Sequence, residues 1–133
     1  MVKISVISLY LESLKDKRNM KKDHSKDAII QQSIEFSLMV IKYVEELESK
    51  KKNVIANQVL ISGTSIGAHI IGARSADAEK DFIHRMKEAD KAAHDTWYWF
   101  YLCEHSEGHG FDKKLTAKLD ELMTLISGVV LSL

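Results

Sequence analysis

Apolar residues recur at helical spacing through four long segments, which are separated by short polar or glycine-containing breaks. The first segment, residues 26–48, carries two neighbouring apolar stripes, through Ile30, Ile34, Ile41 and Val44 and through Ile29, Phe36, Val40 and Leu47. The third, residues 78–103, has the 4-3 spacing of a bundle seam in Phe82, Met86, Ala89, Ala93, Thr96, Phe100 and Cys103. The fourth, residues 112–133, repeats this spacing in Leu115, Leu119, Leu122, Ile126, Val129 and Leu133.

The second segment, residues 54–74, has no charged side chain before Arg74. Such a helix is either enclosed by protein or placed in a membrane. Polar groups along it argue against lipid, where each would need an internal partner: Asn57, Gln58, Ser62, Thr64, Ser65 and His69. We therefore expect an enclosed helix, capped by Asn53, whose Gly63 and Gly67 let a neighbouring helix approach closely.

Short connections between four helices predict an all-α protein, an antiparallel up-down-up-down four-helix bundle over residues 26–133. Residues 1–25 are predicted to be an N-terminal extension of uncertain structure. They form either an extra strand or short helix on the bundle, or an upstream extension of the gene with Met20 as the natural start. Their apolar run is short and lacks a small-residue cleavage site, which argues against a signal peptide.

Five aromatic residues follow one another from Trp97 to Tyr101. At about 100° per residue they point around the whole circumference of a helix, so one internal core cannot receive them all. Exposed apolar surface of this kind marks interfaces, in which aromatic residues are enriched. We expect Trp97, Trp99 or Tyr101 to contribute to contacts between subunits.

Composition adds a compartment and a charge argument. The chain of 133 residues has no proline, which suits uninterrupted helices, and its single cysteine fits a reducing cytoplasm. The 19 basic and 19 acidic residues balance, and from Met20 onward the numbers are 15 and 17, so the bundle is slightly acidic. Lys50, Lys51 and Lys52 form the local basic cluster and are candidate nucleic-acid contacts, although a solvated helix C-terminus, favoured by the helix dipole, is the simpler explanation.

The residues do not predict a metal, cofactor or catalytic site. A di-iron bundle needs Glu-x-x-His pairs, and no Glu in the chain is followed three residues later by His. Cys103, His105 and His109 are close in sequence, but the glycines around His109 break the helix that would align them as zinc ligands. His94 has carboxylates nearby without a nucleophile. Arg18 and His24 resemble the Arg-His motif of small HEPN-type ribonuclease toxins, which leaves an enzyme as an alternative.

The run QVLISGTSIGAHIIGARSADAEKDFIHRMKEA, followed by DTWYWFYL, resembles four-helix-bundle proteins encoded by intervening sequences of bacterial large-subunit ribosomal RNA genes, often named ribosomal proteins. Its specific parts, which we expect to be helix-packing and motif residues, are Ser62, Gly63, Thr64, Ser65, Gly67, Ala68, Lys80, Asp81, Phe82, Thr96, Tyr98 and Trp99.

The resemblance implies an antiparallel four-helix bundle. Through similarity to the accessory variability determinant of diversity-generating retroelements, it also implies a ring-like homopentamer that partners a nucleoprotein enzyme and binds nucleic acid. We expect a non-catalytic, cytoplasmic, oligomeric scaffold or adaptor with at most weak binding of RNA, DNA or a nucleoprotein and with no membrane partner. The alternatives are an RNA-binding module proper and a HEPN-like ribonuclease toxin.

Overall fold

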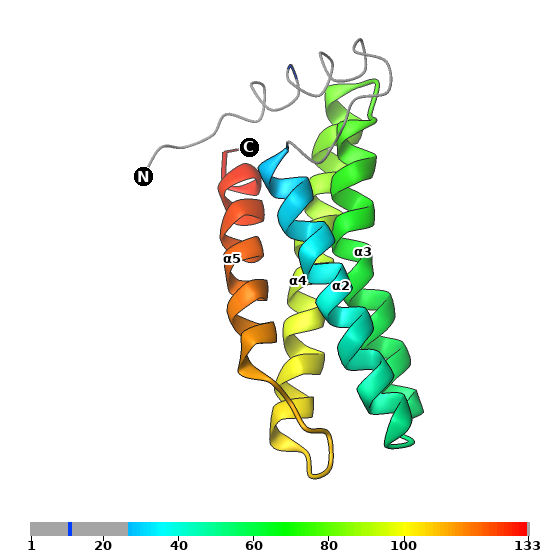
Figure 1. The fold of residues 1–133 in the computed structure, drawn as a ribbon. Helices are drawn as coiled ribbons and strands as arrows, with labels where there is room; N and C mark the ends of the chain where they lie inside the picture. Colours follow the sequence, from blue (N-terminus) through cyan, green and yellow to red (C-terminus); the bar gives the residue numbers. More distant parts are fainter. Residues whose placement is uncertain (1–10, 12–26, 133) are drawn as a thin grey trace.

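The computed structural model describes Leu11 and residues 27–132 of the chain. Within them the regular elements are four α-helices: α2 (Ala28–Ser49), α3 (Asn53–Arg74), α4 (Glu79–His105) and α5 (Lys113–Val130). Successive helices run in opposite directions and lie side by side (Figure 1). The helix α3 packs between α2 and α4, and α5 closes the bundle against α4 and α2. The predicted all-α up-down-up-down bundle is confirmed.

The turn between α2 and α3 is tighter than the sequence suggested. Lys51 adopts a left-handed backbone conformation with φ of 62°, and the Lys52 N–H donates to the Leu47 carbonyl oxygen at 2.9 Å. The chain is thereby reversed one residue earlier than expected. Asn53 is already the first residue of α3, and Lys52 precedes it without a side-chain cap. The prediction that Asn53 caps α3 is therefore wrong.

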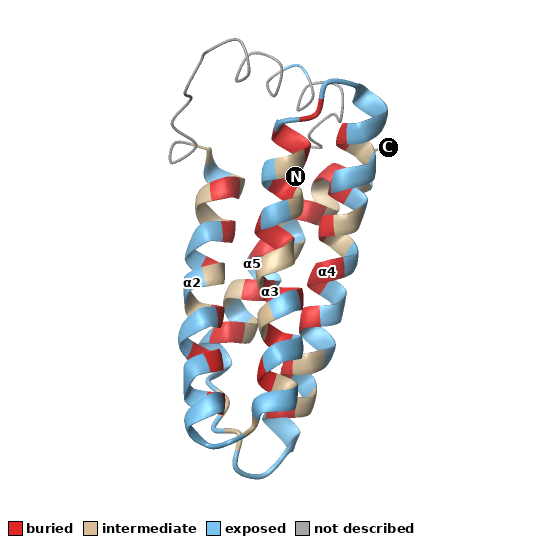
Figure 2. Ribbon diagram, turned by 90° about the vertical axis from the view of Figure 1, so that its right-hand side faces the viewer, coloured by how far each residue is buried: buried red, intermediate tan, exposed pale blue. Residues whose placement is uncertain are grey.

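The predicted seams form the core, where buried residues face the bundle interior (Figure 2). Every residue of the α4 seam is buried, as are the α5 seam residues from Leu115 to Val129. The first stripe of α2 divides, since Ile30 and Val44 are buried whereas Ile34 and Ile41 remain about 40% exposed. The second stripe faces the core, with Phe36, Val40 and Leu47 buried and Ile29 partly buried. The apolar face of α2 is therefore wider than the core can cover, and its edge is exposed to solvent.

The expectation that α3 is enclosed on most sides holds only for the flanks that face α2 and α4. Its outer surface leaves Val54, Ile61 and Ile71 exposed. In a ring of four helices each helix keeps one side turned away from the core, and the uncharged composition of α3 does not alter that geometry.

Small residues bring α2 and α3 close together, as predicted for the glycine motif. A Cβ atom at Gly63 would lie 2.9 Å from both methyl groups of Val40, and one at Gly67 would lie 3.3 Å from the Ser33 hydroxyl. Buried hydroxyls nearby are satisfied within their own helices, since Ser33 donates to the Ile30 carbonyl at 2.8 Å and Thr96 to the Ala92 carbonyl at 2.7 Å.

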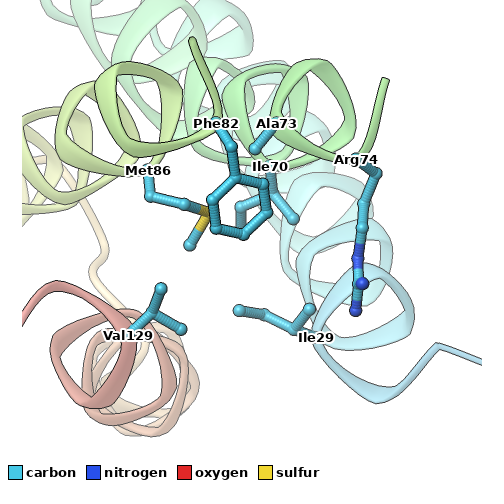
Figure 3. A pocket seen from close by; sticks show the side chains of 7 residues that line it. All are labelled: Ile29, Ile70, Ala73, Arg74, Phe82, Met86 and Val129. Carbon is cyan, nitrogen blue, oxygen red and sulfur yellow. The ribbon is translucent and has the colours of Figure 1, made fainter. Parts of the chain in front are cut away.

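At one end of the bundle an ion pair ties the start of α2 to the end of α3. The Arg74 guanidinium contacts the Asp27 carboxylate, and both side chains are more than nine-tenths buried. Beside this pair lies a gap of about 10 Å³ (Figure 3). Its apolar walls are formed by Ile29, Ile70, Ala73, Phe82, Met86 and Val129. Because that volume is at the limit for one water and the walls are apolar, the gap is a packing defect rather than a ligand site.

At the other end an aromatic cluster anchors the α4–α5 connection. The rings of Tyr43 and Phe100 both lie against Phe111, at centroid distances of 5.6 and 5.3 Å. The Tyr43 hydroxyl donates to the His109 carbonyl oxygen at 3.0 Å. The loop is thus held to α2 by a hydrogen bond between residues 66 positions apart.

Candidate interaction surfaces

An apolar groove runs between α2 and α3 on the outside of the bundle. It has a volume of about 170 Å³ and is lined by Ser33, Ile34, Ser37, Leu38, Gly67, Ala68 and Ile71. Leu38 is 62% exposed, and Ile34 and Ile71 are nearly 40% exposed. No lining residue carries a charge. We call this surface the α2–α3 groove.

The sequence reasoning identified Gly67 and Ala68 in this groove but did not single out Leu38. A signal was present, because Ile34, Leu38 and Ile41 are spaced four and three residues apart and so share one face of α2. Whether this face of α2 points into the core or out to solvent depends on where α3 crosses α2, and residue spacing does not predict that position.

The aromatic run of α4 separates into three environments. Phe100 is buried in the core, and Trp99 is partly buried against it. Tyr98 is 52% exposed beside α3. Trp97 and Tyr101 are 46% and 48% exposed and stack on each other with ring centroids 5.5 Å apart.

The stack continues along α4, because the His105 ring lies on Tyr101 at a centroid distance of 4.3 Å. The His105 Nδ1 also donates to the Tyr101 carbonyl oxygen at 2.9 Å, which fixes the imidazole in place. We call Trp97, Tyr101 and His105 the α4 aromatic ridge. The exposure of Trp97, Tyr98 and Tyr101 confirms the prediction that one core cannot bury all five consecutive aromatic residues.

The ridge and the α2–α3 groove lie on opposite sides of the molecule. Trp99 lines the surface between α4 and α3. Trp97 lies about 200° around the helix from it and therefore on the flank toward α5. Since α4 packs on α3 at one side and on α5 at the other, the ridge borders the α4–α5 side, which is across the bundle from the α2–α3 side.

A second, more polar groove lies between α3 and α4, with a volume of about 530 Å³. We call it the α3–α4 groove; its lining residues are Gln58, Ile61, Ser62, Ser65, His69, Glu88, Lys91, Ala92, Asp95, Tyr98 and Trp99. Four residues of the predicted motif, two from α3 and two from α4, line this groove: Ser62, Ser65, Tyr98 and Trp99.

The remaining motif residues have other places. Gly63 and Gly67 lie at the α2–α3 crossing, Phe82 and Thr96 are buried in the core, and Ala68 lines the α2–α3 groove. Thr64 is partly buried, and Lys80 and Asp81 are exposed in the first turn of α4. The motif therefore combines packing positions with positions on both grooves and does not form one site.

The surroundings of the histidine in the α3–α4 groove disfavour its protonation. Burial lowers the pKa of His69, and the positive charge of Arg85 lowers it further. Arg85 donates from Nη1 to the His69 Nδ1 at 3.2 Å, which requires that nitrogen to be unprotonated. On the other side of the groove Lys91 pairs with Glu88 at 3.5 Å.

Candidate chemical groups elsewhere are engaged in local structure. Cys103 is buried, and burial raises the pKa of its thiol. His94 and His109 direct Nδ1 to the carbonyl oxygens of Asp90 and Glu107. Across residues 27–132 and Leu11, the structure holds no group of three or more metal-ligating side chains. Arg18 and His24, the residues of the ribonuclease alternative, lie outside the described residues, as does the proposed start at Met20.

The basic cluster lies at the loop end of the bundle. Lys50 and Lys51 are exposed, and Lys52 is partly buried. The Lys52 side chain reaches toward Gly108, and the Lys50 ammonium occupies the space beside Gly110, where a Cβ atom would collide with it. Two of the three lysines thus pack along the α4–α5 connection.

By length and composition alone α3 would be able to cross a bilayer, and among the described residues it is the one helix that passes this test. The core helix of a bundle passes the same test. Here α3 packs against α2 and α4 along its length.

Comparisons with known proteins point to one family. A sequence model described as "23S rRNA-intervening sequence protein" matches residues 25–128, which include all four helices except the last residues of α5. The search of curated proteins finds no match.

Among solved structures, the chain is similar to a Bacteroides thetaiotaomicron protein that is described as having unknown function and as belonging to the S23 ribosomal protein family. The two share 28% sequence identity with a TM-score of 0.68, and the alignment covers 77% of this chain and 97% of the other. The resemblance seen in the sequence and the bundle fold are both confirmed.

Proposed function

Because the chain belongs to the 23S rRNA-intervening sequence protein family, we propose that it acts as a non-catalytic, oligomeric scaffold or adaptor. The observation that carries this proposal is a pair of apolar faces that the described residues leave exposed, the α2–α3 groove and the α4 aromatic ridge. Contiguous apolar surface in contact with water is characteristic of interaction sites.

Self-assembly is the use that these faces support best. They lie on opposite sides of a small bundle, and residues 27–132 of one copy leave both exposed. A closed ring of copies covers both, and the family resemblance leads us to expect five subunits.

The adaptor role rests on the α3–α4 groove. This groove stays accessible if copies assemble through the α2–α3 groove and the α4 aromatic ridge. Its volume lies within the range of about 300–1,000 Å³ found for ligand pockets, and it combines aromatic, amide, hydroxyl and charged side chains. This mixture suits a polar partner. The apolar α2–α3 groove suits another apolar surface.

Nucleic-acid binding is a minor part of the proposal. Phosphate contacts require free Lys and Arg side chains, and two of the three clustered lysines pack along the α4–α5 connection. We expect at most weak RNA binding, whereas a binding module proper would bind RNA tightly at low salt and lose affinity steeply as salt rises.

The experiment is light scattering coupled to size exclusion at micromolar concentration, with the full chain. We expect a mass several times the 15.1 kDa of one copy. A mass of one copy would contradict the oligomeric scaffold. Incubation with ribosomal RNA in the same buffer should leave the RNA intact, whereas cleavage that is lost on changing Arg18 or His24 would identify a ribonuclease.

A further inference from the structure

We propose that the α3–α4 groove binds a basic segment of another protein, with an arginine side chain of that segment stacked on the Tyr98 and Trp99 rings and paired with the Asp95 carboxylate. This inference rests on the proposed adaptor role and names the chemistry of the partner.

The groove has the length of a short extended peptide. Its lining residues run from Gln58 to His69 on α3 and from Glu88 to Trp99 on α4. At about 1.5 Å per residue, each helix contributes about 16 Å of wall. An extended strand rises about 3.3 Å per residue, so about five residues of a peptide fit along the groove.

The charges in the groove leave one carboxylate without a partner. Lys91 pairs with the Glu88 carboxylate at 3.5 Å, so these two charges offset each other. Burial and the charge of Arg85 lower the pKa of His69, which disfavours a positive charge there. Asp95 is exposed and makes no ion pair with any residue that the structure describes. The lining therefore has an excess of negative charge, which attracts a cation.

The cation is directed to one end of the groove. At the other end lies the positive charge of Arg85, whose Nη1 donates to the His69 Nδ1 at 3.2 Å. Asp95 lies about 15 Å farther along α4 than Arg85, toward the aromatic residues Tyr98 and Trp99. A bound cation is therefore repelled from the histidine end and attracted to the aromatic end.

Tyr98 and Trp99 form an aromatic corner beside this carboxylate. Their rings meet at an interplanar angle of 63° with centroids 5.3 Å apart. Tyr98 is 52% exposed, and Trp99 is held against the core. The two residues follow Asp95 by three and four positions and so share its face of the helix. A cation placed over the face of a Tyr or Trp ring is attracted to the ring.

An arginine side chain fits this corner better than a lysine does. Its planar guanidinium stacks on an aromatic face while its N–H groups donate to a carboxylate, whereas an ammonium is a point charge. The Ser62 and Ser65 hydroxyls donate to carbonyl oxygens of their own helix, so their oxygens can still accept a hydrogen bond from the guest. A nucleic acid offers phosphates instead, which the Asp95 carboxylate repels.

The experiment measures the binding of a labelled pentapeptide, Gly-Arg-Gly-Arg-Gly with an amidated C-terminus, to the full chain by fluorescence anisotropy. Citrulline in place of arginine keeps the shape of the peptide and removes its charge. We expect the citrulline peptide to bind about tenfold more weakly, because the charge-assisted hydrogen bonds and the cation–π contact are lost. A lysine peptide should also bind more weakly than the arginine peptide.

Equal affinity for the arginine and citrulline peptides would overturn the proposal, as would no binding of the arginine peptide at millimolar protein concentration. Equal affinity for the arginine and lysine peptides would overturn the stacked guanidinium.

Substitutions in the groove test the individual contacts. Asp95→Asn should weaken binding of the arginine peptide about tenfold, because the ion pair is lost. Asp120→Asn makes the same change of charge at an exposed residue of α5 outside the groove, and it should leave the affinity unchanged. Tyr98→Leu should weaken binding about two- to fivefold, whereas Tyr98→Phe keeps a ring face and should keep the affinity. Equal losses in Asp95→Asn and Asp120→Asn would show a general attraction to acidic surface and overturn the site.

A charge reversal provides a gain of binding that a folding defect cannot produce. Asp95→Arg should lose the arginine peptide and bind the same peptide with glutamate in place of arginine. Because Asp95 is exposed, circular dichroism should show unchanged helix content. Retention of the arginine peptide by Asp95→Arg would overturn the proposal.

Light scattering on the same samples separates this inference from the proposed oligomer. An oligomer that does not bind the arginine peptide would overturn the groove assignment and leave the scaffold in place. A wild-type monomer that binds the peptide would overturn the oligomeric scaffold and leave the groove assignment in place.

Discussion

Single residues decide how closely the helices approach. Gly63 allows Val40 of α2 to lie where a side chain of α3 would otherwise be, and Gly67 does the same for Ser33. Gly128 of α5 has no such role, since a Cβ atom there would meet nothing within 4 Å. The same residue type thus has opposite consequences at positions that the sequence alone does not distinguish.

Gly63→Ala should destabilise the bundle by about 1–3 kcal/mol, because the added methyl group overlaps both Val40 methyl groups in a crowded crossing. Gly67→Leu should cost a similar amount at the Ser33 contact. Gly128→Ala is the control and should stabilise by about 0.4–1 kcal/mol through helix propensity. Urea unfolding measures all three, and an unchanged midpoint for Gly63→Ala would argue against the close crossing.

We predict that His69 makes the protein less stable in mild acid. Its folded-state pKa lies below the unfolded value of 6.5, first because of burial and then because of Arg85. As pH falls below about 6.5 the unfolded chain binds the proton first, so the free energy of unfolding decreases. His69→Gln should flatten this part of the profile in urea titrations between pH 7.5 and 5. Arg85→Gln should flatten it partly, and a wild-type slope in His69→Gln would contradict the assignment.

Whole elements are held at their ends by contacts distant in sequence. Arg74 and Asp27 join α3 to α2 at one end, and Lys118 of α5 pairs with Glu35 of α2 at 2.8 Å along the side. The hydrogen bond from Lys118 lowers the pKa of the Glu35 carboxyl. At the other end the Tyr43 hydroxyl secures the α4–α5 connection, and burial raises the pKa of that phenol above its usual range, so it remains a donor.

Tyr43→Phe should lower stability by about 0.5–1.5 kcal/mol, since the His109 carbonyl loses its donor while the ring packing with Phe111 is kept. The amide protons of residues 106–112 should also exchange faster with solvent. Tyr98→Phe changes an exposed phenol and serves as the control, for which a change below about 0.5 kcal/mol is expected. Equal losses in the two variants would remove the special role of the loop anchor.

At the scale of the whole molecule, the proposed assembly through two apolar faces predicts that stability depends on concentration. A chain that assembles through the α2–α3 groove and the α4 aromatic ridge is stabilised by mass action, because association favours the folded state. The midpoint of thermal unfolding should therefore rise with protein concentration across the micromolar range. Leu38→Asp should remove this dependence, and a wild-type midpoint independent of concentration would contradict assembly.

The sequence by itself determined the class of this protein, its four helices and most of its core. Heptad series such as that from Phe82 to Cys103 specify which residues share a face, and helical periodicity is a local property of the chain. The motif residues also carried the family assignment, which the comparison confirmed.

Only the tertiary structure decided what each surplus apolar face does. Trp99 and Trp97 are equivalent in sequence terms, yet one packs against the core and the other stacks outside. Ile34 and Leu38 became groove walls because α3 crosses α2 at Gly63 and Gly67. The end of α3 is also held by a residue distant in sequence, because Arg74 forms an ion pair with Asp27, 47 positions earlier. Periodicity states which side chains point the same way, whereas the packing of one helix on another decides whether that direction is inside or out.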